Sequence, residues 1–307
     1  MSKHKSSGWL AASLVFAVFL WGGNNAGVKF LVGSWPPVFV GATRFLCAGL
    51  LLLAVLRWTS WLGEWQPTPR ELQMRLWLRG GLSLAAYIVT FNWASRFTSA
   101  SNVALLLAAS PLWALLWERH AGSPLELLRK YAAALLALTG VGVLFWPALK
   151  GSSASWPGEA LGVLASFLWT NYGRQCRVLG GSLNGAEITA HTMWRAAIWL
   201  APFAAAEVAR TNVVWRADLA LVQAYCIVAG GVVAFALWAN ALRHWETSQV
   251  LLFNNLIPLS TMTWAYFWLG EPFTHTFGLA LVLIIAGVVL GQAPWRKLVG
   301  PAQAPTE

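Results

Sequence analysis

Charged residues are scarce in this sequence. Only 10% of its 307 residues are Asp, Glu, Lys or Arg, while 58% are hydrophobic. A soluble domain has about 25% charged and about 45–50% apolar residues. So few charges cannot cover a water-facing surface, and most of the chain is therefore expected to face lipid or other parts of itself.

Residues that commonly carry enzyme chemistry are also few. The three cysteines show no metal-ligand spacing and the five histidines are scattered, so the sequence predicts no metal site, no cofactor and no enzyme. The single aspartate, Asp218, falls at the edge of an apolar run, and a buried carboxylate that carries protons or sodium is not expected. The net charge of +10 does not indicate nucleic-acid binding, because the basic residues lie singly in short connections.

Long apolar runs dominate instead. A membrane-spanning helix needs about 17–25 mainly apolar residues, and Gly, Pro and charged residues divide the chain into ten such runs. The first run is too long for the core of a signal peptide and is interpreted as a retained helix. The sequence thus predicts an all-α integral membrane protein with ten transmembrane helices, at residues 8–31, 36–56, 77–95, 99–117, 130–148, 157–175, 188–208, 218–242, 246–269 and 273–293.

The distribution of Lys and Arg predicts the orientation. Of the 21 basic residues, 14 fall on the side of the N-terminus and five on the opposite side, while Arg44 and Arg195 fall within spans. Cytoplasmic loops carry the excess of Lys and Arg. Both termini are therefore expected in the cytoplasm.

The two halves of the sequence resemble each other. Each half has five spans, an odd number, so a second copy would be inverted, and inverted repeats place a substrate site near the midplane at their interface. We expect a first five-helix repeat at 1–150, an inverted second one at 151–297 and a flexible tail at 298–307. The landmarks that recur in the same order, at offsets of 147 to 151 residues, are Pro111/Pro258, Gly140/Gly287, Trp21/Trp169 and Arg44/Arg195.

Several segments together carry a family resemblance. They include LWGGNNAGVKF in the first span, ATRFLCAGLLLL in the second, TSASNVALLLAASPLWALLWE in the fourth and LGVLASFLWTNYGR in the sixth. With these segments the chain resembles, over nearly its whole length, the ten-helix EamA-type branch of the drug/metabolite transporter superfamily. The resemblance implies a carrier of the cell inner membrane, often an exporter of amino acids or related metabolites. Tyr131 stands where the family tends to have Gly, and we expect only a packing difference there.

Polar and aromatic residues inside the spans are the candidates for substrate binding. Neutral amides form hydrogen bonds without carrying a charge, and aromatic walls are typical of small-molecule sites. The alternative role of each amide is an interhelical hydrogen bond, and that of each tryptophan is packing. These candidates are Trp21, Asn24, Asn25, Asn92, Asn102, Trp169, Asn171, Tyr172, Trp238, Asn240 and Asn254.

Arg44 and Arg195 lie inside matching spans, where a guanidinium needs a partner. Each is a candidate for binding a substrate carboxylate, and the alternative is a gate closed against carbonyls of a neighbouring helix. Glu187 and His191 share one helical face with Arg195, which makes them candidates for proton coupling. The alternative is that Glu187 reaches cytoplasmic water and His191 bonds to a neighbour. The prolines of spans four and nine, Pro111 and Pro258, are expected to be gating hinges or fixed kinks.

The sequence therefore favours a secondary transporter that exports amino acids or related small metabolites by alternating access through a central cavity between the repeats. The alternative is a carrier of drugs or nucleotide-linked solutes, which the scarcity of central basic residues weakens. A membrane-embedded enzyme is a distant alternative. The expected partners are a small-molecule substrate and the lipid bilayer, not nucleic acid, and a monomer is compatible with the pattern.

Overall fold

The computed structural model describes residues 3–62, 64–65, 67–110, 113, 117, 124–150, 156–179, 183–211, 213–242, 253–254 and 256–292. These residues form helices joined by short connections, with no strand among them, which confirms the expected all-α fold. The elements are α1 (Lys3–Ser34), α2 (Pro37–Trp58), α3 (Arg70–Arg75), the π-helical η1 (Leu76–Gly81), α4 (Leu82–Phe97), α5 (Ala100–Ala108), α7 (Pro124–Lys150), α8 (Trp156–Leu179), α9 (Gly185–Arg210), α10 (Ala217–Tyr225), η2 (Cys226–Val233), α11 (Ala234–Leu242), α13 (Ile257–Trp264), η3 (Ala265–Leu269) and α14 (His275–Gln292).

Each of the ten expected spans contains helix. The third and eighth spans are continuous helices with a π-helical stretch inside them, α3–η1–α4 and α10–η2–α11. The third span begins at Arg70, seven residues before the expected start, and α1 extends beyond both expected ends. Pro69 occupies the N-cap of α3, and the polar first turns carry the helix past the apolar run that hydropathy detects. The connection between the second and third spans, expected at 57–76, is correspondingly shorter.

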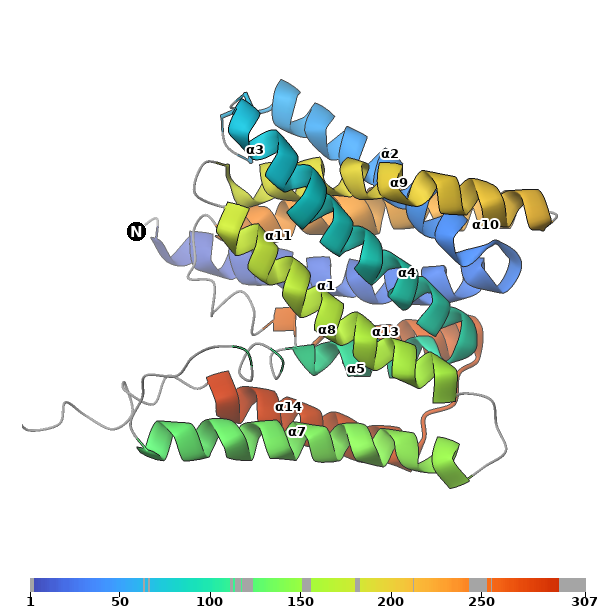
Figure 1. Cartoon of the computed structure of the whole chain (residues 1–307). Coiled ribbons are helices and arrows are strands. Elements are labelled where there is room, and N and C mark those ends of the chain that lie inside the picture. The colour runs from blue at the N-terminus through green and yellow to red at the C-terminus, as the bar shows by residue number, and fades with distance from the viewer. Residues whose placement is uncertain are drawn as a thin grey trace, which may run out of the picture.

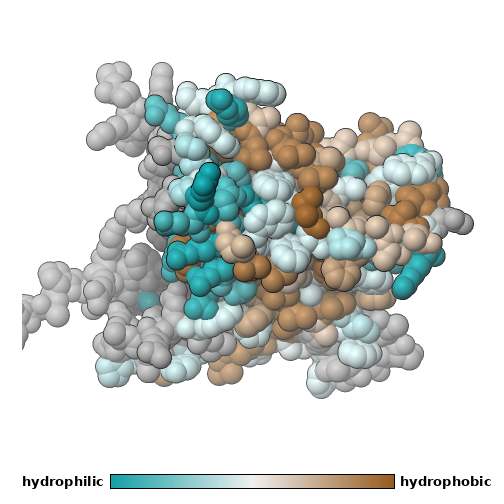
Figure 2. All heavy atoms as spheres, turned by 45° about the horizontal axis from the view of Figure 1, so that its top comes forward, coloured by the Kyte–Doolittle hydropathy of each residue, from teal (hydrophilic) through white to brown (hydrophobic). Residues whose placement is uncertain are grey.

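The helices run side by side between two ends of the molecule (Figure 1). The N-terminus, the start of α3 and the end of α8 lie at one end, and the turns after α1 and α4 lie at the other. In the space-filling view, hydrophilic residues gather at the end that carries α3, and apolar residues cover the middle (Figure 2). Large side chains such as Leu51, Leu135 and Phe267 are exposed on the surface. Such extensive apolar exposure is expected of a surface that faces hydrocarbon.

Three helical stretches of the described part are long and apolar enough to cross a membrane: Gly8–Ser34, Pro37–Trp58 and Ala217–Trp238. Two shorter apolar helices are Tyr131–Val143 and His275–Gly287.

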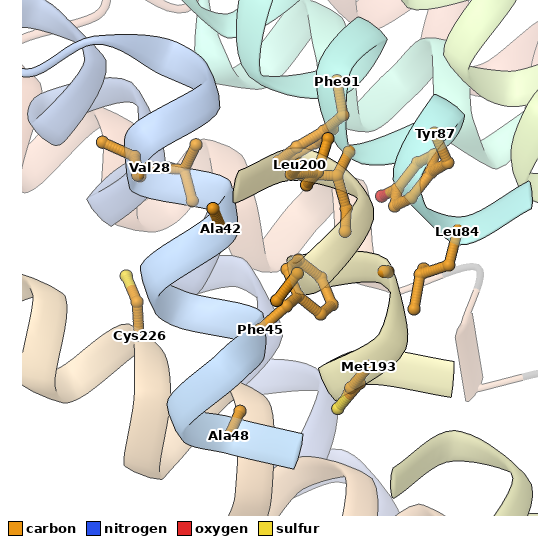
Figure 3. Packing of buried hydrophobic residues seen from close by; sticks show 14 of the residues in the cluster. Val28, Ala42, Phe45, Ala48, Leu84, Tyr87, Phe91, Met193, Leu200 and Cys226 are labelled. Carbon is orange, nitrogen blue, oxygen red and sulfur yellow. The ribbon is translucent and has the colours of Figure 1, made fainter. Parts of the chain in front are cut away.

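The most extensive helix–helix contact in the described part is that of α2 with α9, which are the second and seventh spans. A Cβ atom on Gly49 would lie 2.7 Å from the backbone nitrogen of Trp194, so these helices meet backbone to backbone, as small residues allow in membrane proteins. Phe45, Met193 and Leu200 pack in the core around this crossing (Figure 3). The main core is thus formed between the two halves of the chain.

The fifth and tenth spans, α7 and α14, form a separate pair at the edge of the molecule (Figure 1). A Cβ on Gly140 would lie 3.0 Å from the Ala280 carbonyl oxygen, and one on Gly287 would lie 2.7 Å from the Ala133 carbonyl oxygen. The two helices therefore contact each other reciprocally, with glycine against backbone on both sides.

Candidate functional site

Arg44 lies inside the bundle with only 4% of its surface exposed. Its Nη1 donates to Asn24 Oδ1 of α1 at 3.0 Å, and its guanidinium carbon lies 4.5 Å from the centre of the Phe45 ring. Its buried Nε has no hydrogen-bond partner, and among the described residues no carboxylate forms an ion pair with it. A buried cation without an anion is costly, so a negatively charged group at this position would stabilise Arg44.

Other predicted residues surround Asn24 on α1. Trp21 donates from Nε1 to the Gly230 carbonyl oxygen of η2 at 3.1 Å, and its ring lies 6.2 Å from that of Trp238. Asn25 donates from Nδ2 to Thr261 Oγ1 of α13 at 3.1 Å. The structure therefore gathers Trp21, Asn24, Asn25, Arg44 and Trp238 along α1 and the helices that contact it. We call these five residues the Arg44 site.

The second arginine, Arg195, uses its bonding capacity differently. It is 2% exposed, and its Nη1 reaches the Nδ1 of His191 at 3.1 Å and the His191 carbonyl oxygen at 3.0 Å. Its Nη2 donates to Gln73 Oε1 of α3, and its guanidinium carbon lies 4.2 Å from the Trp194 ring. Arg195 thus joins α9 to α3, and its buried Nε, like that of Arg44, has no hydrogen-bond partner.

The two candidates for proton coupling have separate surroundings. Glu187 belongs to a capping box at the start of α9, where its Oε2 accepts from the Asn184 N–H at 2.9 Å and Asn184 Oδ1 accepts from the Glu187 N–H. His191 Nε2 lies 2.8 Å from Thr68 Oγ1. The expected contact between His191 and Arg195 is present, while the Glu187 carboxylate bonds to the N-cap residue.

An aromatic and amide group lies on α8. The Trp169 ring is 4.9 Å from that of Tyr87 and 5.5 Å from that of Tyr172, and the Tyr172 hydroxyl lies 2.8 Å from Thr192 Oγ1. Asn171 donates to Ser83 Oγ at 3.3 Å. These contacts join α8 to α4 and α9.

The remaining amides differ in their partners. Asn92 is completely buried and donates to the Pro37 carbonyl oxygen at 2.8 Å, which is the interhelical bond that the alternative interpretation predicts. Asn240 is buried on α11. Asn254 is half-buried, and its Oδ1 has no partner.

The fourth and ninth spans are interrupted at matching places. A turn at Ala109 follows α5, and its N–H bonds to the Leu106 carbonyl; a turn at Leu256 precedes α13, and its N–H bonds to the Phe253 carbonyl. Both positions are related by the same offset of 147 residues as the prolines. Pro258 lies in the first turn of α13, where a proline removes no helical hydrogen bond. Pro111 lies outside the described residues.

Sequence reasoning missed two polar groups. Thr170 Oγ1 donates to the carbonyl oxygen of Ser110, at the α5 break, at 2.9 Å, and the Ser110 and Ser166 hydroxyls lie 3.2 Å apart. The carboxylate of Glu159, in the first turn of α8, accepts from the predicted candidate Asn102 at 3.3 Å. The hydroxyl residues Ser166 and Thr170 lie one helical turn apart beside Trp169. This spacing was a signal in the sequence that could have identified the first group.

Glu159 and Glu187 correct the expectation that buried carboxylates are missing from this chain, since both are almost fully buried. That expectation followed from the lack of aspartate in the span interiors. Glu159 lies near the beginning of its span, and its burial depends on a tertiary contact that hydropathy does not report.

The sequence matches the model of the EamA-like transporter family twice, at residues 8–146 and 156–291. A transporter of Archaeoglobus fulgidus is 27% identical over 91% of this chain and 96% of its own length. A probable terminal-alkyne amino-acid exporter of Streptantibioticus cattleyicolor is 25% identical over 84% of this chain and 88% of its own.

A probable amino-acid metabolite efflux pump of Escherichia coli is 22% identical over 93% of this chain and 96% of its own. One solved crystal structure superposes with a TM-score of 0.62 at 19% identity, covering 92% of this chain and 97% of the solved one. That likeness concerns the fold.

Proposed function

The chain belongs to the EamA-like transporter family, and from this membership and the names of its relatives we propose that it exports amino acids or closely related metabolites. It is a multi-pass membrane transporter of small molecules and not an enzyme. Two relatives are named for amino acids or their metabolites, which supports the substrate class. The excess of Lys and Arg on the side of the N-terminus supports placing both termini in the cytoplasm, at the inner membrane.

The two halves of the chain act as inverted repeats in this proposal. The family model matches each half separately, the helix breaks at Ala109 and Leu256 recur at one offset, and α7 and α14 pack reciprocally. Repeats related in this way supply two matched gates for alternating access. The substrate passes between the halves, and the interrupted helices of spans four and nine, with Pro111 and Pro258 beside the breaks, are the segments that bend.

The Arg44 site binds the substrate carboxylate. The observation that carries this assignment is that Arg44, buried without a carboxylate partner among the described residues, donates to Asn24 alone there, whereas the equally buried Arg195 bonds to His191 and Gln73. Asn24 holds the guanidinium from one side at 3.0 Å, and the Nε without a partner supplies a further donor. A guanidinium recognises a carboxylate through two parallel hydrogen bonds, and an amino acid supplies such a carboxylate.

Uptake into liposomes by the purified protein tests this function. Labelled amino acids would be offered singly, and we expect saturable transport of at least one of them. Arg44→Gln removes charge-assisted hydrogen bonds that stabilise binding by about 1.5–3 kcal/mol, so KM rises roughly 10- to 100-fold. A folded protein that transports none of the amino acids would overturn the assignment, and transport of drugs or nucleotide-linked solutes would replace it.

Arg195→Gln is the matched contrast, because it changes the equivalent arginine of the other half. Its partners are His191 and Gln73 within the protein, so the loss falls on stability and KM changes less than for Arg44→Gln. Equal increases in KM for both variants would contradict a carboxylate site at Arg44 alone.

A further inference from the structure

Glu159 is a buried carboxylate with incomplete hydrogen bonding. It is 2% exposed. Its Oε1 accepts from Asn102 Nδ2 at 3.3 Å, while its Oε2 is buried and has no partner. An ionised carboxylate in such surroundings costs several kcal/mol unless a cation accompanies it, and a proton on the carboxyl group removes that cost.

The burial of Glu159 has an identifiable cause next to it. A Cβ on Gly158 would lie 2.7 Å from the Thr98 backbone nitrogen and 2.8 Å from the Phe97 carbonyl carbon. The first turn of α8 therefore lies directly on the turn between α4 and α5. Thr98 in that turn also accepts, through Oγ1, from Asn102 Nδ2 at 3.4 Å. The contact encloses the carboxyl group between the sixth span and the start of the fourth.

The charged groups around this turn are engaged elsewhere. Lys29 of α1 donates to the Thr98 carbonyl oxygen at 2.7 Å, and Arg96 at the end of α4 donates to the Val32 carbonyl oxygen. Glu271, which precedes α14, accepts from the N–H groups of the first turn of α5. Among the described residues, no cation forms an ion pair with Glu159.

From this geometry we propose that Glu159 carries the proton that drives transport, an inference that rests on the proposed export function. The neutral carboxyl group is compatible with the contact between Gly158 and Thr98. The ionised group requires water and favours the arrangement in which this contact opens. Two protonation states thus select two conformations.

The proton movement in one cycle can be stated by atoms. The contact lies at the end of the bundle where α4 meets α5, away from the N-terminus (Figure 1), which is the outer end in the proposed orientation. A proton from the outer solution forms an O–H bond at Oε2, and the outer end closes. The same bond breaks when the opposite end opens and its water reaches Oε2, and the proton passes to that water. Protons therefore move into the cell while substrate leaves it.

Carbodiimide labelling tests proton binding without any substrate. Dicyclohexylcarbodiimide reacts with protonated carboxyl groups in apolar surroundings, and mass spectrometry locates the adduct. We expect modification of Glu159 at least fivefold greater at pH 6 than at pH 8, while the exposed Glu71 stays unmodified. Absence of the adduct at Glu159 at both pH values, in folded protein, would overturn the proposal.

Transport measurements test the coupling. Glu159→Gln has the shape of the neutral carboxyl group, so it should favour the closed outer end, slow the exchange of labelled amino acid between equal solutions and lose at least fivefold of the acceleration by a proton gradient. Glu159→Asp keeps a titratable group and should restore part of that response, and Glu71→Gln should retain all of it. A full gradient response in a folded Gln variant would overturn the proposal.

The two proposals fail in different ways. If the wild-type protein exchanges no amino acid, the proposed function fails, and the carbodiimide result still decides whether Glu159 binds a proton. If exchange occurs but wild-type transport ignores the gradient, the proton proposal fails and the export function stands.

Discussion

Gly140 of α7 packs against the Ala280 carbonyl of α14, and Gly287 of α14 packs against the Ala133 carbonyl of α7. Adding the offset of 147 residues converts Gly140 into Gly287 and Ala133 into Ala280. The same contact is therefore made twice, once from each half. This reciprocity supports the proposed inverted repeats more directly than shared residue types do, because it concerns the packing of the helices.

Gly287→Ala should destabilise the protein. Its Cβ would lie 2.7 Å from the Ala133 carbonyl oxygen, so the pair must separate, and overpacking of this kind costs about 1–3 kcal/mol. Gly142, on the same helix as Gly140, has nothing within 4 Å of its Cβ position. There, alanine should stabilise the helix by about 0.5–1 kcal/mol. Thermal unfolding in detergent measures both variants, and a shift of the same sign would contradict the packing described.

Asn92→Ala and Asn24→Ala should distinguish an amide that joins two helices from an amide that belongs to the Arg44 site. Asn92 joins α4 to the Pro37 carbonyl, so its loss should lower stability by about 0.6–2 kcal/mol with KM unchanged. Asn24 positions the Arg44 guanidinium, so its loss should raise KM by less than Arg44→Gln does. Thermal unfolding and transport kinetics are measured on the same preparations. An increased KM for Asn92→Ala alone would reverse the two assignments.

Asn184→Ala should lower stability without altering proton coupling. Its side chain accepts from the Ala186 and Glu187 N–H groups at the start of α9, and loss of such a cap costs about 0.5–2 kcal/mol. The acceleration of transport by a proton gradient should match the wild type. A lost gradient response would bring Glu187 and His191 forward as the coupling residues in place of Glu159.

Glu271→Gln should loosen the beginning of α5. The carboxylate accepts from the Ala100 N–H at 2.7 Å and from the Ser101 N–H and hydroxyl, and hydrogen bonds to charged groups contribute about 1.5–3 kcal/mol. Hydrogen exchange measured by mass spectrometry should become faster in the first turn of α5 and remain unchanged at the capped start of α9. Unchanged exchange in α5 would show that the cap contributes nothing there.

The ten spans could be predicted because each is a long apolar run bounded by glycine, proline or charge. The roles of single residues were harder to predict. Asn24 and Asn92 are both amides inside apolar helices, and only the partner distinguishes them: a buried guanidinium for one, a backbone carbonyl for the other. A partner that is distant in sequence leaves no trace in the local pattern.

The two buried glutamates differ in how far the sequence predicts their positions. Asn184 and Glu187 have the spacing of a capping box, so the position of Glu187 was readable from the sequence. Glu159 lies close to the beginning of an apolar run, where a carboxylate normally reaches water. Its burial requires the contact between Gly158 and Thr98, which forms only when α8 lies on the turn after α4.

The pairing of α7 with α14 also sets an order for the biogenesis of the protein. About 125 residues separate the end of α7 at Lys150 from the beginning of α14 at His275. At a synthesis rate of about 5–20 residues per second, α7 leaves the ribosome roughly 6–25 seconds before its partner. During that interval the glycine face of α7 must be covered by lipid or by the insertion machinery. A helix of the second half, made later, therefore completes the packing of the first half of the molecule.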